Sequence, residues 1–326
     1  MVYLTRIIIC TLIGGVSFSH YGTNNFCTEC PPYQPFCKIS ALEGGEFNIP
    51  LEFVISNSAP GVVEVQPALC FLIQHSNKAE KIMFDLGMGR DDISQPPALQ
   101  KALSNPLFSH RVPQDCVESL ALGNLTPSDI DIVILSHLHC DHVGDTRVFR
   151  RSKFVVGNGC HKLLEKCYPE DPESIYASDL LPHDRTRFLP PADSDVVEGW
   201  KAIGPFPHAY DFYEDGSLYI IDSPGHLIGH VNILARTSSD GAWIYLAGDS
   251  AHHWNLITGE SQIAVGAPWD VKYCAHHDKQ KADGHIANIQ TLWKMPRVRI
   301  LLAHDTQWWN ANKVGSAFWP GIIPSL

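Results

Sequence analysis

The densest group of metal-binding side chains in the sequence lies at residues 137–142. Three imidazoles and one carboxylate occur there within six residues: His137, His139, Asp141 and His142. They directly follow the apolar run 130–135, which is typical of a buried strand. Imidazole and carboxylate suit Zn²⁺, and a turn after a strand can direct alternate side chains at one point. The alternative is a polar loop with chance histidines, but such a cluster is costly to pack without a metal.

This segment resembles the His-x-His-x-Asp-His signature of the metallo-β-lactamase superfamily and matches it at every fixed position. The resemblance extends over about residues 38–310. It implies an α/β fold in four layers, an αβ/βα sandwich with its metal site at one edge of the two sheets. In that superfamily a His in a Gly-His turn, a bridging Asp after a strand and a late His complete the site. The matching residues here are His226, Asp249 and His304.

The strand pattern agrees with these three positions. Each residue lies just beyond an apolar run that predicts a strand, at 218–221, 243–246 and 300–302 respectively. All three would therefore emerge at one edge of the sandwich, beside the first cluster. Taken alone, each is also a residue type found in cores and loops, so the agreement matters more than any single position.

The resemblance also implies a role for each ligand. One zinc ion is held by His137, His139 and His226, a second by Asp141, His142 and His304, and Asp249 bridges them. Two such cations lower the pKa of bound water, so that a hydroxide between them is the expected nucleophile, and they polarise the scissile carbonyl. Asp141 is then the expected proton donor to the leaving group.

The same ligand set distinguishes branches of the superfamily. A Cys in place of Asp249 is typical of the antibiotic-hydrolysing β-lactamases, and a Glu in place of His139 is typical of the di-iron, oxygen-reducing branch. Neither substitution is present. The leader Ala41–Gly45 and the long segment 143–225 are most similar to the N-acyl homoserine lactonase-like group, whose fungal relatives open lactone or lactam rings.

One residue departs from that group. The bacterial lactonases carry a Tyr three residues after the bridging Asp, where it contacts the substrate carbonyl, and this chain has His252 there. The resemblance therefore does not assign homoserine lactones as the substrate. His252 either supplies the missing hydrogen bond as a catalytic residue or is a solvated loop residue.

Further candidates lie outside the motif. The segment 204–213 is unusually aromatic; in it we expect Tyr210 and Tyr213 to contact the substrate, and Phe206 to pack in the core. Asp85 follows a predicted strand and is expected to accept a hydrogen bond from a ligand imidazole. The polar cluster at 276–278 is assigned no role.

Strands and helices must position these residues. Apolar runs predict strands at 68–74, 81–84, 130–135, 153–156, 218–221, 231–235, 243–246 and 300–302. Helical spacing predicts helices at 97–108, 115–122, 160–167 and 284–294. The proline-rich segment 168–194 is expected to be an insertion or lid. Strands at both ends with helices between them suit two packed sheets in a single hydrolase domain, residues 37–326.

Residues 1–36 are expected to lie outside that domain. The run 7–16 and the small residues after it suit a signal peptide at 1–19, but an unstructured extension fits equally, so secreted and cytoplasmic locations both stay open. Cys27, Cys30 and Cys37 suit disulfides outside the cell. The pair Cys27 and Cys30 would also suit a zinc ribbon, but no second pair with suitable spacing follows. The net charge of −11 disfavours nucleic acid and anionic membranes as partners.

These observations favour a hydrolase with two Zn²⁺ ions per chain that opens a small lactone or γ-lactam, as in detoxification or secondary metabolism. A thioester hydrolase similar to glyoxalase II is an alternative in the same class. A mononuclear-iron, persulfide-oxidising enzyme would need only His137, His139 and His226, so the intact second set argues against it. An inactive scaffold would have no use for all seven ligands.

Overall fold

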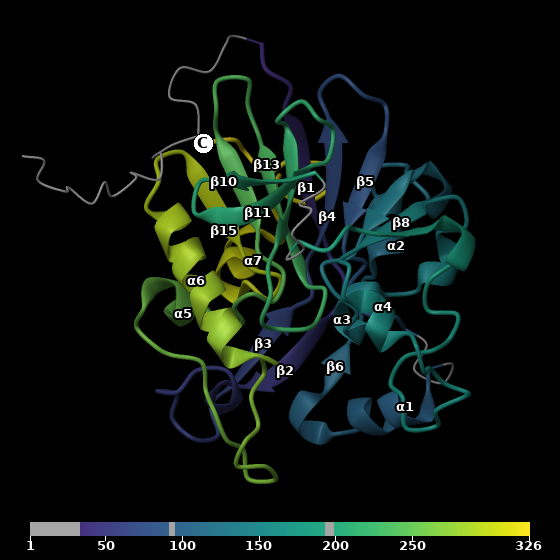
Figure 1. The fold of residues 1–326 in the computed structure, drawn as a ribbon, viewed down its shortest axis with the longest axis vertical. Helices are drawn as coiled ribbons and strands as arrows, with labels where there is room; N and C mark the ends of the chain where they lie inside the picture. The colour runs from purple at the N-terminus through teal and green to yellow at the C-terminus, as the bar shows by residue number, and fades with distance from the viewer. Residues whose placement is uncertain (1–32, 91–94, 193–198) are drawn as a thin grey trace, which may run out of the picture.

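The computed structural model describes residues 33–90, 95–192 and 199–326. Two six-stranded sheets pack face to face, and helices cover the outer face of each (Figure 1). The expected four-layer αβ/βα sandwich is confirmed.

The first sheet contains the strands of the N-terminal half. Its order is β1 (Cys37–Leu42), β4 (Cys70–His75), β5 (Lys81–Phe84), β7 (Ile132–Ile134), β8 (Lys153–Val156) and β9 (Thr186–Phe188). The strands β5, β7, β8 and β9 are parallel, so their carboxyl ends meet at one edge. The strands predicted at 68–74 and 81–84 are present as β4 and β5, which pair antiparallel with Phe71 opposite Phe84.

The second sheet contains the strands of the C-terminal half. Its order is β10 (Trp200–Ile203), β11 (Phe206–Asp211), β12 (Leu218–Asp222), β13 (Val231–Arg236), β14 (Trp243–Leu246) and β15 (Val298–Leu301). Both β12 and β14 are antiparallel to β13, and β15 is parallel to β14. The carboxyl ends of β12, β14 and β15 therefore also meet at one edge.

Short elements complete the fold. A three-stranded sheet has the order β3 (Val63–Pro67), β2 (Glu46–Pro50) and β6 (His110–Arg111). The helices are α1 (Pro97–Leu103), α2 (Cys116–Ala121), α3 (Cys140–Val143), α4 (Cys160–Leu163), α5 (Trp254–Thr258), α6 (Lys279–Trp293) and α7 (Thr306–Asn312). Single turns of 3-10 helix lie at Leu51–Phe53, Pro106–Phe108, Pro127–Asp129, Thr146–Val148 and His183–Arg185. Among the described residues, no helix has the length and apolar character that a membrane crossing needs.

The central strands are buried on both faces. In β13, Ile233 belongs to the core between the sheets, and its neighbour Leu234 packs under the helix layer with Ile289 of α6. In β7, Ile134 points into the same central core, and Val133 packs with Leu120 of α2. Burial on both faces explains why these strands read as continuous apolar runs in the sequence.

The structure corrects several predicted boundaries. The helix expected at 160–167 ends at Leu163, and the helix expected from residue 284 already begins at Lys279. The proline-rich segment 168–194 contributes β9 to the first sheet. The aromatic segment contains the strand β11, in which Phe206 is fully buried and stacks on Tyr245, as expected for a core residue.

The predictions for the N-terminal segment fall partly outside the described residues. The possible signal peptide at 1–19, with Cys27 and Cys30, lies outside the described residues. Cys37 is buried in β1, where its thiol lies 3.9 Å from the carbonyl oxygen of Ser217. The first described strand, β1, begins at Cys37.

Candidate metal centre

The segment 137–142 is held in place by a residue from the neighbouring strand. Asp85 follows β5 and accepts hydrogen bonds from the backbone N–H of Ser136 at 2.7 Å and from its hydroxyl at 2.8 Å. Ser136 and Asp85 are both buried. This contact fixes the start of the turn that carries the first histidines, and His139 then caps the short helix α3.

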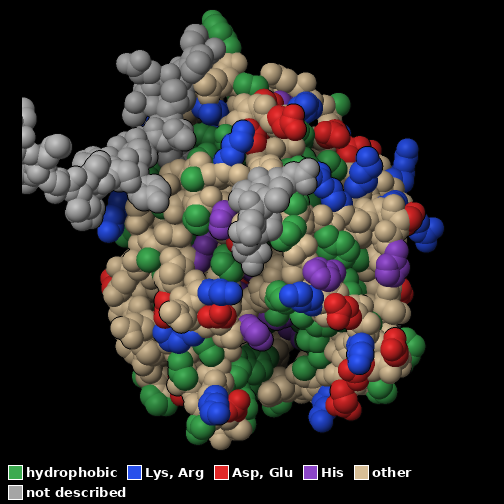
Figure 2. Space-filling model, in the orientation of Figure 1, with side chains coloured by type: hydrophobic (Ala, Val, Ile, Leu, Met, Phe, Trp, Pro, Cys, Tyr) green, Lys and Arg blue, Asp and Glu red, His purple; other side chains and the backbone are tan. Residues whose placement is uncertain are grey.

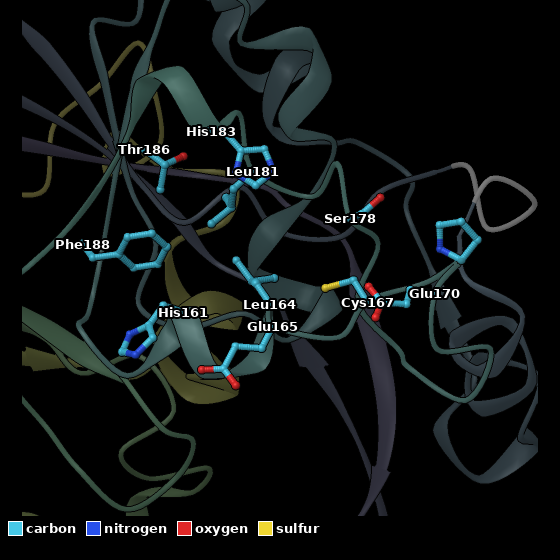
Figure 3. Close-up of a pocket in the computed structure, with 11 residues that line it drawn as sticks. His161, Leu164, Glu165, Cys167, Glu170, Ser178, Leu181, His183, Thr186 and Phe188 are labelled. Atoms are coloured by element: carbon cyan, nitrogen blue, oxygen red, sulfur yellow. The ribbon is translucent and has the colours of Figure 1, made fainter.

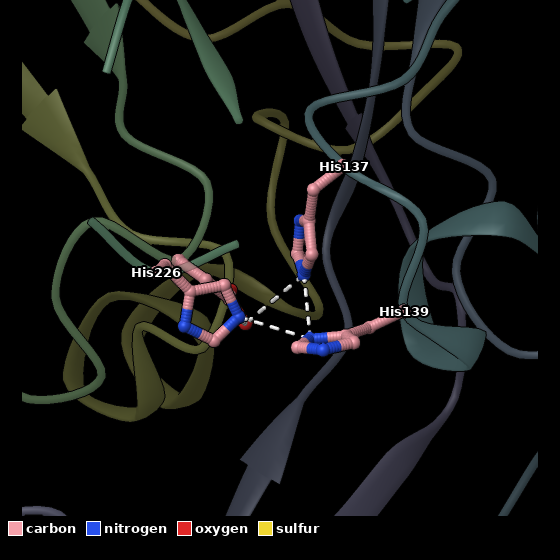
Figure 4. Close-up of side chains that lie close together, drawn as sticks. His137, His139 and His226 are labelled. Atoms are coloured by element: carbon pink, nitrogen blue, oxygen red, sulfur yellow. Dashed lines mark hydrogen bonds and ion pairs between the residues drawn. The ribbon is translucent and has the colours of Figure 1, made fainter. Parts of the chain in front are cut away.

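One group of donor atoms comes from this turn and from the end of β12. His139 Nδ1 lies 2.9 Å from His137 Nε2 and 2.9 Å from His226 Nε2 (Figure 4). The carboxylate oxygen Oδ2 of Asp249 lies 3.3 Å from His226 Nε2 and 3.7 Å from His137 Nε2. Four ligand atoms from three segments of the chain therefore converge on one point.

A second group shares Asp249. Its other oxygen, Oδ1, lies 3.0 Å from His304 Nε2 and 3.1 Å from His142 Nε2. Asp141 Oδ2 lies 3.4 Å from His304 Nε2 and 3.7 Å from His142 Nε2. The two oxygens of Asp249 thus face two different groups of donors, as a bridging carboxylate would.

The backbone around Asp249 depends on a glycine and a further histidine. Gly248 has φ +46°, and a Cβ there would lie 2.9 Å from His230 Nε2. That nitrogen accepts a hydrogen bond from the backbone N–H of Asp249 at 3.1 Å, and His230 Nδ1 lies 2.8 Å from the hydroxyl of Ser223. Burial lowers the pKa of His230 to about 3, so it is neutral. The sequence analysis missed His230, although it lies in the turn that begins with His226.

The donor atoms fit metal ions. His142 Nε2, His304 Nε2 and Asp249 Oδ1 are buried without a hydrogen-bond partner in the described chain, and carboxylates and imidazoles are the usual ligands of zinc. The opposite ring nitrogens are well partnered. His137 Nδ1 lies 3.0 Å from the Ser136 hydroxyl, His142 Nδ1 lies 2.8 Å from Asp85, and His304 Nδ1 lies 2.7 Å from the carbonyl of Pro67. Such contacts orient ligating histidines, and Asp85 makes the contact expected of it.

Burial and neighbouring charges together set the pKa values of the clustered side chains. Burial and the surrounding imidazoles hold the pKa of His137 well below its usual range, and burial does the same for His226. For His142, burial also lowers the pKa, but the carboxylates of Asp249, Asp141 and Asp85 outweigh it and raise the pKa. For Asp249, burial raises the pKa, and the neighbouring imidazoles outweigh that effect, so the carboxylate is ionised.

His252 lies at the cluster, as expected of a catalytic candidate. Its Nε2 is 3.3 Å from Asp249 Oδ2, and its ring is parallel to that of His304 at 6.0 Å. His252 is buried, which contradicts the alternative of a solvated loop residue. Its neighbour His276, to which the sequence analysis assigned no role, packs against it with ring centroids 4.9 Å apart.

The two tyrosines expected to contact substrate lie elsewhere. The hydroxyl of Tyr210 accepts a hydrogen bond from Arg187 at 2.6 Å. Tyr213 packs against His75, at the end of β4 opposite the edge that carries Asp85. The reason is the strand β11, which runs antiparallel to β12 and carries these residues away from the metal edge. Neither tyrosine therefore lies at the metal edge, where substrate contacts were expected.

The surface is hollowed at two places near these elements. Histidine side chains lie at the margin of a hollow in the lower half of the face shown in Figure 2. A separate cavity of about 690 Å³ lies between α4 and the proline-rich segment; its lining includes His161, Leu164, Leu181 and Phe188 (Figure 3). None of the residues that line this cavity belongs to the seven-residue cluster.

Comparison with known proteins gives a family match and several fungal relatives. The family model of the metallo-beta-lactamase superfamily matches residues 63–259. Gamma-lactamase FDB1 of Fusarium pseudograminearum is 34% identical over 189 residues, which are 56% of this chain and 45% of that protein. Gamma-lactamase MBL2 of Gibberella moniliformis is 34% identical over 174 residues, 53% of this chain and 71% of that protein.

A longer match is to a larger protein. Cytochrome P450 monooxygenase mpaDE' of Penicillium brevicompactum is 32% identical over 268 residues, which are 76% of this chain and 30% of that protein. The chain thus spans about a third of the length of the two Penicillium brevicompactum relatives.

Solved structures share the fold. A mutant of AiiA from B. thuringiensis, with N-decanoyl-L-homoserine bound at its active site, superimposes with a TM-score of 0.61 at 19% identity. The match covers 88% of this chain and 99% of that chain. An N-acyl homoserine lactone hydrolase with N-hexanoyl-L-homoserine at its catalytic metal centre gives the same values.

Proposed function

The chain belongs to the metallo-β-lactamase superfamily, and from this we propose that it is a two-zinc hydrolase that opens a small lactone or γ-lactam ring. The observation that carries the proposal is the position of Asp249, whose two carboxylate oxygens face two separate groups of donor atoms. We further propose that the hydrolase domain spans residues 37–326.

Seven residues would hold the metals. His137, His139 and His226 would bind one zinc ion, Asp141, His142 and His304 would bind the other, and Asp249 would bind both. When bound, two such ions polarise a carbonyl oxygen and lower the pKa of water to near neutrality. Asp85 and the other partners hold the opposite ring nitrogens. These contacts would keep the ligating nitrogens directed at the metal ions.

Two residues would act on the substrate. His252 is held beside Asp249 and would donate a hydrogen bond to the substrate carbonyl, in place of the Tyr of the bacterial lactonases. Asp141 is partly exposed, unlike the buried Asp249, so a substrate can reach its carboxyl group. It would take up the proton that the attacking water loses and pass it from Oδ to the ring atom that leaves the carbonyl.

The proposed substrate class combines the fold with the relatives. Two fungal relatives carry the name gamma-lactamase, and one of the solved structures is an N-acyl homoserine lactone hydrolase. A lactone and a γ-lactam share the same cyclic acyl group and differ in the atom that leaves. The partner is therefore a small molecule, and a role in detoxification or secondary metabolism would follow.

The test is hydrolysis of a panel of lactones, γ-lactams and acyclic thioesters by zinc-loaded protein. We expect ring opening, with a rate that falls by about 100-fold or more in Asp249→Ala, because both donor groups lose a shared ligand. Exposed Asp179→Ala is the matched control and should retain the wild-type rate. Thioester cleavage without ring opening would instead assign the glyoxalase II-like alternative.

A further inference from the structure

Three buried histidines form a group that shares His226 with the seven ligands. His226, His252 and His276 are only 5%, 6% and 2% exposed, and one ring nitrogen of each lies within 4.8 Å of the other two. His276 is held there by the backbone, because the N–H of His277 donates to the carbonyl of His226 at 2.9 Å. The N–H of Asp278 donates to the carbonyl of Gly225 at 2.8 Å. The group is therefore tied to the same turn as a metal ligand.

These rings have nitrogens without partners in the described chain. Nδ1 of His226, Nδ1 of His252 and both ring nitrogens of His276 are buried and make no hydrogen bond there. This distinguishes His226 from His142 and His304, whose opposite nitrogens face Asp85 and a backbone carbonyl. A buried donor without a partner costs about 1–3 kcal/mol, so such a group points to a ligand that satisfies it.

The spacing selects an oxygen atom. One ring nitrogen of His276 lies within 4.8 Å of a ring nitrogen of His252, and two nitrogens at that separation can both hydrogen-bond to one oxygen atom between them at about 2.8 Å. A zinc–nitrogen bond is only about 2.0–2.1 Å long. At ring-nitrogen separations of 4.8 Å, a third metal ion would therefore require the rings to move closer together. A neutral imidazole offers one donor and one acceptor nitrogen, which suits an oxygen.

We propose that His252 and His276 form a pocket, beside the metal ligand His226, for one oxygen atom of the substrate, with His276 as a substrate-binding residue. The inference rests on the proposed function, because His226 and His252 also serve the metal centre. The ligand class is the acyl oxygen of a ring-opening reaction, as a carbonyl in the substrate and as a carboxylate in the product. His276 donates a hydrogen bond to it and takes no part in bond cleavage.

The first test is steady-state kinetics of zinc-loaded variants on the ring that the wild type opens fastest. His276→Phe should raise KM by about 10-fold or more and leave kcat within about threefold, because it keeps the ring shape and removes the donor. His276→Gln, which restores an N–H donor, should recover part of that loss. Exposed His277→Phe is the matched control and should change neither constant.

The second test is equilibrium binding of 5-hydroxypentanoate, the ring-opened form of δ-valerolactone, to the same zinc-loaded proteins. We expect His276→Phe to weaken binding by about 10-fold and His277→Phe to leave it unchanged. Binding is measured without turnover, so it tests the pocket even if no ring is opened and the proposed function fails.

Three results would overturn the inference. A loss of bound metal in His276→Phe would make the residue a metal ligand. A fall in kcat with KM and product binding unchanged would make it a support for His252. Equal product binding by the wild type and His276→Phe would remove the pocket altogether.

Discussion

Nε2 of His304 lies 3.0 Å from Oδ1 of Asp249, although the two residues follow different strands, β15 and β14. The strands are parallel neighbours, so their carboxyl ends bring a late histidine to a carboxylate whose other oxygen faces His226. Both atoms of this pair are buried without hydrogen-bond partners in the described chain. A shared carboxylate between two donor groups is the geometric basis of the two-metal account.

Removal of the metals should destabilise the protein. The donor atoms of Asp249, His142 and His304 would then stay buried without partners. A ligand present at about 1,000 times its Kd stabilises a folded protein by about 4 kcal/mol, so chelation should lower Tm by several degrees and added zinc should restore it. Thermal unfolding followed by circular dichroism gives the measurement. An unchanged Tm after complete chelation would contradict the account.

Asp85→Asn should weaken metal binding without removing a ligand. Asp85 accepts from His142 Nδ1 and fixes Ser136, so its loss should lower metal affinity or activity by about 10- to 100-fold. Competition with a chromogenic chelator measures the affinity. Asp131→Asn, at an exposed Asp before β7, is the control. Equal affinities in the two variants would show that Asp85 does not orient a ligand.

Tyr210→Phe and Tyr213→Phe should leave KM for the best substrate within about twofold of the wild type. The Tyr210 hydroxyl lies beside Arg187 and the Tyr213 ring packs against His75, both away from the metal edge. Steady-state kinetics on both variants provide the check. A KM raised tenfold in either one would restore the original expectation that it contacts substrate.

Glu43 should make stability depend on pH in a definite direction. Burial raises the pKa of Glu43, although Trp309 Nε1 donates to its carboxylate at 2.9 Å. The unfolded chain therefore releases this proton at a lower pH than the folded protein does, and folded stability falls as pH rises from the ordinary Glu pKa towards the raised one. Denaturant unfolding from pH 4 to 8 should show the wild type losing stability relative to Glu43→Gln over that window. The opposite trend would contradict burial as the dominant cause.

The sequence predicted best the strands that are buried on both faces. Strands such as β7 and β13 are buried on both faces, so they appear as unbroken apolar runs. The strands β7, β12, β14 and β15 end at the metal edge, which is why residues placed after these strands came together. The sequence did not predict β11, because Pro207 and His208 interrupt its apolar pattern and half of the strand faces outward. The small sheet of β2, β3 and β6 was missed because β3 is mostly exposed at its start.

Tertiary contacts position the remaining residues of the site, which the sequence pattern did not predict. His230 and His276 belong to no spacing pattern, and each is placed by hydrogen bonds around the turn at Gly225 and His226. Gly225 has φ +138°, and a Cβ there would lie 2.4 Å from the backbone nitrogen of Ala282 in α6. That close approach of helix to turn involves residues far apart in sequence, so local periodicity carries no signal for it.

Metal content of the purified protein, measured by elemental analysis, tests the central claim most directly. The account predicts about two zinc ions per chain in the wild type and fewer in Asp249→Ala, because one carboxylate serves both donor groups. One iron per chain with oxygen uptake, or no bound metal after incubation with zinc, would contradict it.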